Sequence, residues 1–461
     1  MTVLDLFTDD RAAAIEALHN ATALYTAHPI VDGLLARLDW PHAGRTLFDP
    51  CAGDGSFLDA ALRRLIAAGA TVDDIVARIS GWEIHPGAVA SAHERLAATL
   101  TEAGFGDATR IARQLVLEHD FLTDAPAATY DAIATNPPYL RFAHVPPMLR
   151  EQYETTTPDF ACSDLLHAFL HRCAQLLTPN GRIAAVTSDR WLFIQTAAQL
   201  RERLGSMLSL THLTRLDAST SFYRPKHRRA GTPPRIHPVE VLLERTGNGI
   251  TLTSAPIYPD AQPDTDPNAP TLGEVATLKL APWLGTPGIF VVSAAVAATL
   301  PADTLVPAID TDNFRADDTI APAMQYAIRT TAHTPPPTVL AHLERTLPQM
   351  CERGKRRTNP TWLPPETWTQ HFPLDCEALL VPRIAKRLRV LRLPIGHLPI
   401  NHNVTVIVAP GRIDEIEAAL RSESTQRWIA ARAHRLENGY LSMTTSLLRQ
   451  LPLPTLNKEA A

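Results

Sequence analysis

Residues 44–62, GRTLFDPCAGDGSFLDAAL, determine the predicted fold class. They read as a short apolar strand, a turn of small residues and a helix. Gly53 and Gly55 allow the turn to approach a ligand closely, and the start of the helix presents free N–H groups. In open α/β sheets a ligand binds at this edge of the sheet. We therefore predict cofactor contacts from Asp49, Pro50, Cys51, Ala52, Gly53, Gly55 and Phe57.

The same strand-then-helix order repeats over about the first 250 residues. ARISGWEIH (77–85), YDAIATNPPY (130–139) and NGRIAAVTS (180–188) each read as a strand that ends at a turn or loop. Stretches with helical spacing lie between them. This alternation predicts a parallel, doubly wound, Rossmann-like α/β sheet covered by helices on both faces.

Two further strand ends carry acidic residues. Glu83 and Ile84 follow the second apolar run, and Asp120 and Phe121 end the stretch LEHDFL. A carboxylate at the position of Glu83 can accept hydrogen bonds from both ribose hydroxyls of a nucleoside cofactor. Asp120 can accept from an adenine amino group while Phe121 packs against its ring. We therefore predict that all four residues bind the cofactor.

The motif Asn136-Pro137-Pro138-Tyr139 carries the predicted chemistry. Two consecutive prolines fix φ and remove two N–H donors, so the local carbonyl groups are held rigidly. The side-chain oxygen of Asn136 and the carbonyl of Pro137 could grip an amino group on an aromatic ring and aim its lone pair at an electrophilic methyl group. Tyr139 could stack on the base that carries the amino group once that base has left the duplex. This chemistry needs no metal.

The order of these pieces resembles the gamma class of N6-adenine DNA methyltransferases, specifically the TaqI-like modification methylases. Their opening motif, T-P-x-x-V-V, is similar to YTAHPIVDGL, which places Thr26 against the methionine part of S-adenosylmethionine (SAM). The family also carries a second aromatic on the far face of the flipped adenine. TSFYRPKHRR is similar to that region, with Phe222 as first choice and Tyr223 as second. Two departures are Ala27 in place of proline and His85 in place of aspartate.

The resemblance implies a SAM-dependent catalytic domain, residues 1–253, followed by a mixed α+β target-recognition domain, residues 271–461. The segment 254–270 is rich in proline and acidic residues and is predicted to be a linker. Double-stranded DNA would be the substrate, and a restriction endonuclease or defence-system subunit would be a separate chain. Two alternatives remain open. One is an N-methyltransferase acting on RNA or a protein glutamine, and the other is a non-catalytic subunit of a defence complex.

Charge is unevenly distributed in this chain of net charge −5. Residues 341–461 contain 17 Lys and Arg against 11 Asp and Glu, or +6, which leaves −11 for the rest. A basic portion of an acidic chain can bind a polyanion or form a solvated face. Arg353–Arg357 is the favoured groove contact because Trp362 and Trp368 follow it. The candidate DNA contacts are Lys226, Arg228, Arg229, Arg353, Lys355, Arg356, Arg357, Lys386 and Arg387.

The remaining composition indicates a globular cytoplasmic protein. The apolar fraction is 45%, no run of about 18 apolar residues suggests a membrane span, and the acidic start MTVLDLFTDD does not resemble a signal peptide. The five cysteines form no CxxC pair, which favours reduced thiols over disulfides or a zinc site. We predict no metal.

Overall fold

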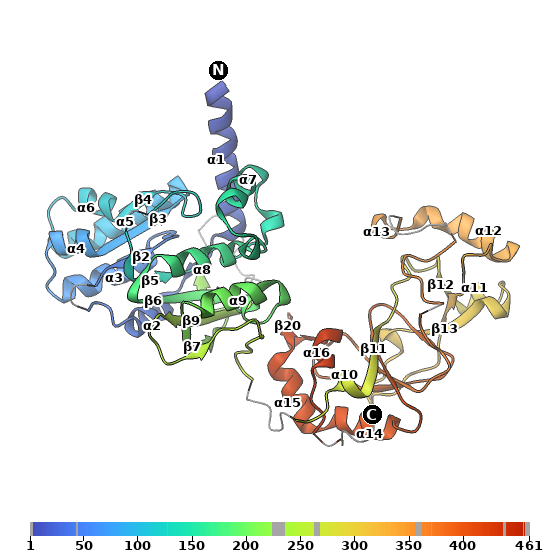
Figure 1. The fold of residues 1–461 in the computed structure, drawn as a ribbon. Coiled ribbons are helices and arrows are strands. Elements are labelled where there is room, and N and C mark those ends of the chain that lie inside the picture. Colours follow the sequence, from blue (N-terminus) through green and yellow to red (C-terminus); the bar gives the residue numbers. More distant parts are fainter. Residues whose placement is uncertain are drawn as a thin grey trace. The chain divides into compact units, whose positions relative to one another are not determined.

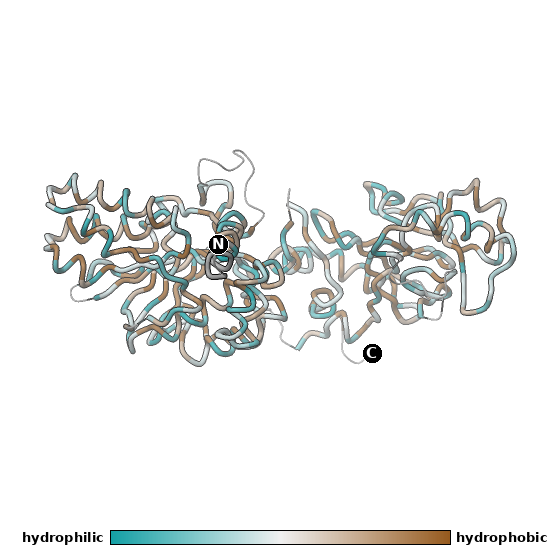
Figure 2. Tube along the Cα trace, turned by 90° about the horizontal axis from the view of Figure 1, so that it is seen from above, coloured by the Kyte–Doolittle hydropathy of each residue, from teal (hydrophilic) through white to brown (hydrophobic). Residues whose placement is uncertain are grey.

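The structure is a computed structural model that divides the chain into two compact units, Met1–Pro259 and Asp260–Ala461 (Figure 1). The described residues are 3–42, 45–126, 128–223, 236–261, 268–355, 362–369, 371–436, 439–454 and 456, without the side chains of 3–9 and 355. Hydrophobic and hydrophilic residues alternate at short intervals along the chain in both units (Figure 2).

An eight-stranded sheet forms the centre of the first unit, in the order β10-β7-β9-β6-β5-β2-β3-β4. Its strands are β2 (Leu47–Asp49), β3 (Ile79–Glu83), β4 (Val116–Glu118), β5 (Tyr130–Thr135), β6 (Leu177–Ser188), β7 (Ser209–Arg215), β9 (Pro238–Glu244) and β10 (Ile250–Thr251). Five adjacent strands of this sheet, β4, β3, β2, β5 and β6, run parallel to one another. Their carboxyl ends therefore meet at one edge, where the predicted cofactor residues lie.

The prediction of a parallel sheet is wrong at one side. β9 is antiparallel to both β6 and β7, and β10 is antiparallel to β7. Residues 216–237, which join β7 to β9, contain the short strand β8 (Phe222–Tyr223) but no helix among their described residues. A parallel return needs a crossover, usually a helix. β9 instead pairs directly with β7 and runs in the opposite direction.

Helices cover both faces of this sheet. Strand residues alternate between faces, so adjacent residues of β2 enter different cores: Leu47 packs with one set of helices and Phe48 with the other. The first set is α2 (His28–Arg37), α3 (Ser56–Ala67), α5 (Pro86–Glu102) and α6 (Ala108–Leu115), with α4 (Val72–Arg78) beside it. The second set is α1 (Val3–Thr22), α7 (Pro147–Thr156), α8 (Leu165–Gln175) and α9 (Ala198–Gly205). The sheet is thus the doubly wound layer that the sequence predicts.

The predicted linker starts as part of the first unit. Arg201 in α9 is fully buried, and its guanidinium donates to the carbonyl groups of Ser254, at 2.6 Å, and Ala255, at 3.0 Å. The Ile257 amide donates to the carbonyl of Leu192 at 2.8 Å. These contacts hold residues 254–257 on the first unit, and the division between the units falls after Pro259.

The second unit combines small sheets with short helices. Its sheets are β11-β19-β15-β17, β12-β14-β13-β18 and β16-β21-β20, and among their described pairings only β13 with β18 is parallel. The strands are β11 (Ala276–Leu280), β12 (Val291–Ser293), β13 (Leu305–Ile309), β14 (Gln325–Ile328), β15 (Ala378–Val381), β16 (Ile384–Ala385), β17 (Leu391–Leu393), β18 (Leu398–Pro399), β19 (Val404–Val408), β20 (His434–Arg435) and β21 (Leu441–Ser442). The α-helices are α10 (Leu272–Val275), α11 (Ala294–Ala297), α12 (Pro337–Thr346), α13 (Glu352–Lys355), α14 (Ile413–Arg421), α15 (Glu423–Arg432) and α16 (Thr445–Arg449). Within the described parts of both units, no helix has the length and apolar character needed to cross a membrane.

Candidate functional site

The turn between β2 and α3 has a backbone that favours glycine. Gly53 and Gly55 have φ values of 56° and 82°, in the left-handed region. A Cβ atom on Gly53 would lie 2.9 Å from the ring of Tyr25, and one on Gly55 would lie 3.0 Å from the Cβ of Ala92. The turn therefore packs closely against its neighbours while its backbone faces the edge of the sheet.

Glu83 ties the end of β3 to this turn. Its side chain is buried, one carboxylate oxygen accepts from the Gly53 amide at 2.9 Å, and the other accepts from the His85 amide at 2.9 Å. Burial raises the pKa of this carboxyl group. Each oxygen retains a further lone pair, so the oriented carboxylate can still accept from a pair of hydroxyl groups.

Asp49 lies at the carboxyl end of β2 and is almost fully buried. One of its oxygens accepts from the Cys51 amide at 3.2 Å. Burial raises the pKa of Asp49 to about 7. A buried carboxyl group with such a pKa would be held in its charged form by a nearby cation.

Asp120 follows β4 and is also buried. It accepts from the Leu122 amide at 3.1 Å and forms an ion pair of 3.2 Å with Arg11 of α1. Burial raises the pKa of Asp120 in spite of this cation. Phe121 beside it is 2% exposed and packs with Phe169, with ring centroids 5.1 Å apart.

The proline-rich loop after β5 holds Asn136 in a defined orientation. The Asn136 amide nitrogen donates to the Leu24 carbonyl at 2.8 Å, and its oxygen accepts from the Tyr139 hydroxyl. That hydroxyl also lies 2.8 Å from the carbonyl of Val186, a second acceptor. Burial raises the pKa of Tyr139 far above its usual value, so it remains a hydrogen-bond donor. The amide oxygen of Asn136 keeps one lone pair for a ligand.

One pocket joins the turn to this loop. It is a partly open cleft, and the space between its lining atoms, open solvent included, is about 720 Å³. Its lining includes predicted residues from four strand ends, namely Pro50, Cys51, Gly53, Glu83, Ile84, Asp120, Phe121, Asn136 and Pro138. The topology of the sheet therefore brings together residues that are up to 88 positions apart in the sequence.

Other predicted site residues do not line this pocket. Ala52 and Phe57 are buried in the core on the α3 side of the sheet, and Pro137 is buried within its loop. Phe222 packs partly against the same core as Phe57. Thr26 pairs with Phe222 across the two-stranded sheet of β1 (Tyr25–Thr26) and β8. The Thr26 hydroxyl is buried and has no hydrogen-bond partner in the described part of the chain.

The sequence prediction missed the contribution of the covering helices to the pocket. Leu18, His19, Thr22 and Ala23, at the end of α1, line one side of it. The missed lining residues from elsewhere are Leu24, Tyr25, His119, Tyr153, Leu165 and Phe169. Tyr25 and His119 could have been found, because each directly precedes a predicted site residue, Thr26 and Asp120 respectively. The others come from elements whose packing over the pocket has no local sequence signal.

Comparison with known proteins identifies the relatives of the first unit. Residues 91–221 match the family model of the Eco57I restriction-modification methylases. The chain is 26% identical over 242 residues to the Type II methyltransferase M.XhoI of Xanthomonas vasicola, a match that covers 46% of this chain and 44% of that protein. It is 25% identical over 243 residues to the Type II methyltransferase M.PaeR7I of Pseudomonas aeruginosa, covering 50% and 41%.

The chain is thus similar to restriction-modification methyltransferases, and the residues that match the family model lie within the first unit. The chain spans less than half the length of these two relatives. Its fold is similar to that of the Type IIL restriction-modification enzyme MmeI in complex with DNA, with a TM-score of 0.58 at 15% identity over 97% of this chain and 66% of MmeI. The predicted fold class of the first unit, a Rossmann-like doubly wound α/β sheet, is confirmed.

The described cations of the predicted DNA contacts lie beside aromatic or acidic partners. The Arg353 guanidinium lies 4.5 Å from the centre of the Trp283 ring, and the Lys386 ammonium lies 5.6 Å from that of Tyr440. Lys226, Arg228, Arg229, Arg356 and Arg357, and the side chain of Lys355, lie outside the described residues. The expected contribution of Trp368 to a groove is wrong, because its side chain is 2% exposed and packs in a core of the second unit.

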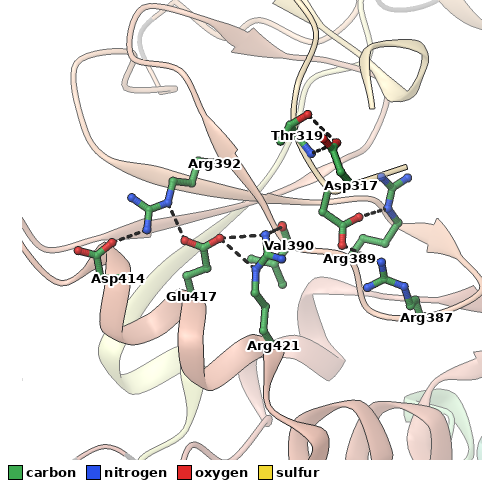
Figure 3. Close-up of polar contacts among 10 residues, drawn as sticks. Asp317, Thr319, Arg387, Arg389, Val390, Arg392, Asp414, Glu417 and Arg421 are labelled. Carbon is green, nitrogen blue, oxygen red and sulfur yellow. Dashed lines mark hydrogen bonds and ion pairs between the residues drawn. The ribbon is translucent and has the colours of Figure 1, made fainter. Parts of the chain in front are cut away.

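Arg387 and its neighbour Arg389, both labelled in Figure 3, pair with the same carboxylate, that of Asp318. The Asp318 oxygens lie 2.7 Å from Arg387 and 2.6 Å from Arg389. These ion pairs lower the pKa of Asp318 although burial opposes them. The Arg387 side chain remains 57% exposed and that of Arg389 only 22%, so Arg387 has the more accessible donors. In a separate group, Arg392 is paired with Asp414 and Glu417 (Figure 3).

Proposed function

We propose that this chain transfers a methyl group from SAM to the N6 amino group of an adenine flipped out of double-stranded DNA. The observation that carries this proposal is that one pocket is lined both by the Pro50–Gly53 turn and by the Asn136–Pro138 loop. A methyl donor held by the turn would lie beside acceptors that can hold an amino group. The likeness to restriction-modification methyltransferases supports the same reaction class.

The residues present fit SAM. Glu83 offers an oriented carboxylate for the ribose hydroxyls, and Asp120 offers one for the adenine amino group. Thr26 has a buried hydroxyl that no described residue satisfies, which suits the methionine part. Asp49 adds a buried carboxyl group at the same edge of the sheet. When bound, SAM supplies an electrophilic methyl group on a positively charged sulfur. A cationic ligand is compatible with this acidic lining.

In this proposal the residues of the chain hold and orient the target amino group. Hydrogen bonds with Leu24 and Tyr139 fix the Asn136 amide, so its oxygen can accept one hydrogen of the target amino group with its remaining lone pair. The Pro137 carbonyl would accept the other hydrogen. These bonds hold the amino nitrogen with its lone pair directed at the methyl group, and the nitrogen loses a proton to solvent after transfer. Tyr139 and Phe222 are the proposed stacking residues for the flipped base, although their rings pack partly against different cores and neither lines the pocket.

The second unit, together with the basic residues 226–229 of the first unit, would supply the DNA contacts. Phosphate contacts position a protein on a duplex, and base-edge contacts read its sequence. The basic residues proposed for the first role include Arg353, Lys386 and Arg387, which the structure describes, as well as Lys226, Arg228, Arg229, Lys355, Arg356 and Arg357.

A methyl-transfer assay with labelled SAM tests the proposal. The full chain is incubated with unmodified plasmid DNA, with RNA of the same sequence and with a glutamine-containing protein mixture. We expect label only in DNA, and long-read sequencing of that DNA should report N6-methyladenine in one sequence context. Label in RNA or protein would overturn the DNA assignment. SAM binding without transfer to any substrate would instead indicate a non-catalytic subunit.

A further inference from the structure

A polar cluster on the outer side of the cofactor turn joins three separate parts of the first unit. Asp54 belongs to the turn, Arg95 to α5 and Tyr223 to β8. The Tyr223 hydroxyl donates to the Asp54 carboxylate at 2.7 Å, and Arg95 pairs with the same carboxylate oxygen. The Arg95 guanidinium also donates to the Asp54 backbone carbonyl at 2.9 Å and to the Tyr223 hydroxyl oxygen at 3.3 Å.

Asp54 is the buried centre of the cluster, whereas Arg95 and Tyr223 are only partly buried. Asp54 is 8% exposed, and its other carboxylate oxygen is buried without a partner among the described residues. Burial and the neighbouring Asp54 charge raise the pKa of Tyr223 well above its usual value, which keeps its hydroxyl protonated as a donor. Hydrogen bonds to a charged group in such surroundings are stronger than those between neutral groups.

The strand that carries Tyr223 is also joined to the pocket through its backbone. Tyr223 pairs with Tyr25 across β1 and β8, and the two rings meet edge to face with centroids 5.6 Å apart. The Tyr25 ring in turn packs closely on Gly53, and both residues line the pocket. Tyr223 thus contacts the cofactor turn directly through Asp54 and indirectly through Tyr25.

We infer that Tyr223, Asp54 and Arg95 are positioning residues that hold the Cys51–Gly55 turn in its cofactor-binding conformation. This assigns Tyr223 a role that depends on its hydroxyl, in place of the stacking role suggested by its position next to Phe222. Stacking needs only the aromatic ring, whereas positioning needs the hydroxyl. Replacing Tyr223 by phenylalanine removes one and keeps the other. The inference rests on the proposed function because the ligand of the turn is taken to be SAM.

The test measures SAM binding to the full chain by calorimetry. We expect Tyr223→Phe to weaken binding about 10-fold, and Tyr130→Phe to leave it unchanged, because the Tyr130 ring stacks on Phe48 at the start of β5, outside the pocket lining. Asp54→Asn removes the ion pair with Arg95 and should weaken binding to a similar extent. The double variant that combines Tyr223→Phe with Asp54→Asn should bind SAM no more weakly than the more affected single variant, because all three side chains act as one unit.

A second measurement needs no cofactor. Hydrogen exchange in the ligand-free chain follows the amides of Gly53 and Gly55, which donate to Glu83 and to the Ala52 carbonyl. We expect both to exchange about 10-fold faster in Tyr223→Phe and at the wild-type rate in Tyr130→Phe. Unchanged exchange and unchanged SAM affinity in Tyr223→Phe would overturn the inference alone. A wild-type chain that binds no SAM would overturn the proposed function instead.

Discussion

The cofactor pocket and the basic clusters differ in whether their predicted residues come together in space. In the first unit, Gly53, Glu83, Asp120 and Asn136 come from separate strand ends and line one pocket. In the second unit, Arg353, Lys386 and Arg387 each have their own local partner, respectively Trp283, Tyr440 and Asp318. Parallel strands bring their carboxyl ends to a common edge, whereas charge in a sequence places no constraint on where cations meet.

The largest expected effect tests the pocket side of this comparison. Asn136→Ala removes the amide oxygen proposed to accept from the target amino group and leaves the cofactor residues in place. We expect methyl transfer to fall by about 10³-fold or more, in the range of a lost transition-state contact, with SAM affinity within about twofold of wild type. Single-turnover transfer and calorimetry measure the two quantities. Asn20→Ala, an exposed change on α1, is the matched control, and an active Asn136→Ala enzyme would refute the role of the loop.

A smaller effect is expected at the ribose position. Glu83→Gln keeps the shape of the side chain but replaces one acceptor oxygen by a donor, which cannot accept from the Gly53 or His85 amide. We expect SAM affinity to fall about 10- to 100-fold, equivalent to about 1.4 to 2.8 kcal/mol. Calorimetry measures the change, with Glu118→Gln on the exposed side of β4 as control. Equal losses in the two variants would mean that charge near the sheet edge matters more than the hydrogen bonds of Glu83.

The raised pKa of Asp49 predicts how the free energy of unfolding depends on pH. Its folded-state pKa of about 7 lies above the ordinary value of 3.8, so the folded chain holds a proton that the unfolded chain releases. Between about pH 4 and pH 7 the free energy of unfolding should therefore decrease by up to about 1.4 kcal/mol per pH unit from this group, and change little above pH 7. Asp49→Asn keeps an acceptor for the Cys51 amide and removes the titration. Urea unfolding at pH 5 and pH 8 should show a smaller decrease in the variant, and identical decreases would contradict the raised pKa.

Much of the first unit could be predicted because its signals are local. Strand, turn and helix follow one another within 44–62, and the cofactor residues sit directly after apolar runs. The antiparallel β9 could not be predicted, since its apolar residues read the same in either direction. Residues of α1 that line the pocket were missed for a related reason. Their position depends on long-range contacts such as the ion pair of Arg11 with Asp120, 109 residues away.

The second unit shows the limit of reasoning from composition. Trp368 and Arg353 lie close in the sequence and were predicted to share a groove contact, yet Trp368 is buried in a core. An aromatic residue in a basic stretch fits a core and a binding surface equally well, and only tertiary packing distinguishes them. The predicted fold of this unit, mixed α+β, needed less information because short strands and helices alternate irregularly along it.

The smallest expected effect separates the two arginines that share Asp318. Arg387 is 57% exposed and uses one of its five donors on Asp318, so it can also contact a phosphate. Arg389 is 22% exposed, and its guanidinium also donates to the Arg315 carbonyl.

We expect Arg387→Ala to weaken DNA binding about 3- to 10-fold and to reduce the slope of log affinity against log salt by about 1. Arg389→Ala should instead lower the free energy of unfolding by about 1 to 3 kcal/mol, because it leaves buried Asp318 with one partner fewer. Fluorescence anisotropy over a salt series and urea unfolding measure these outcomes, with Arg427→Ala on the exposed side of α15 as control. A salt slope that changes equally in all three variants would place Arg387 on a solvated face, and the basic clusters would then have lost their best described candidate for a DNA contact.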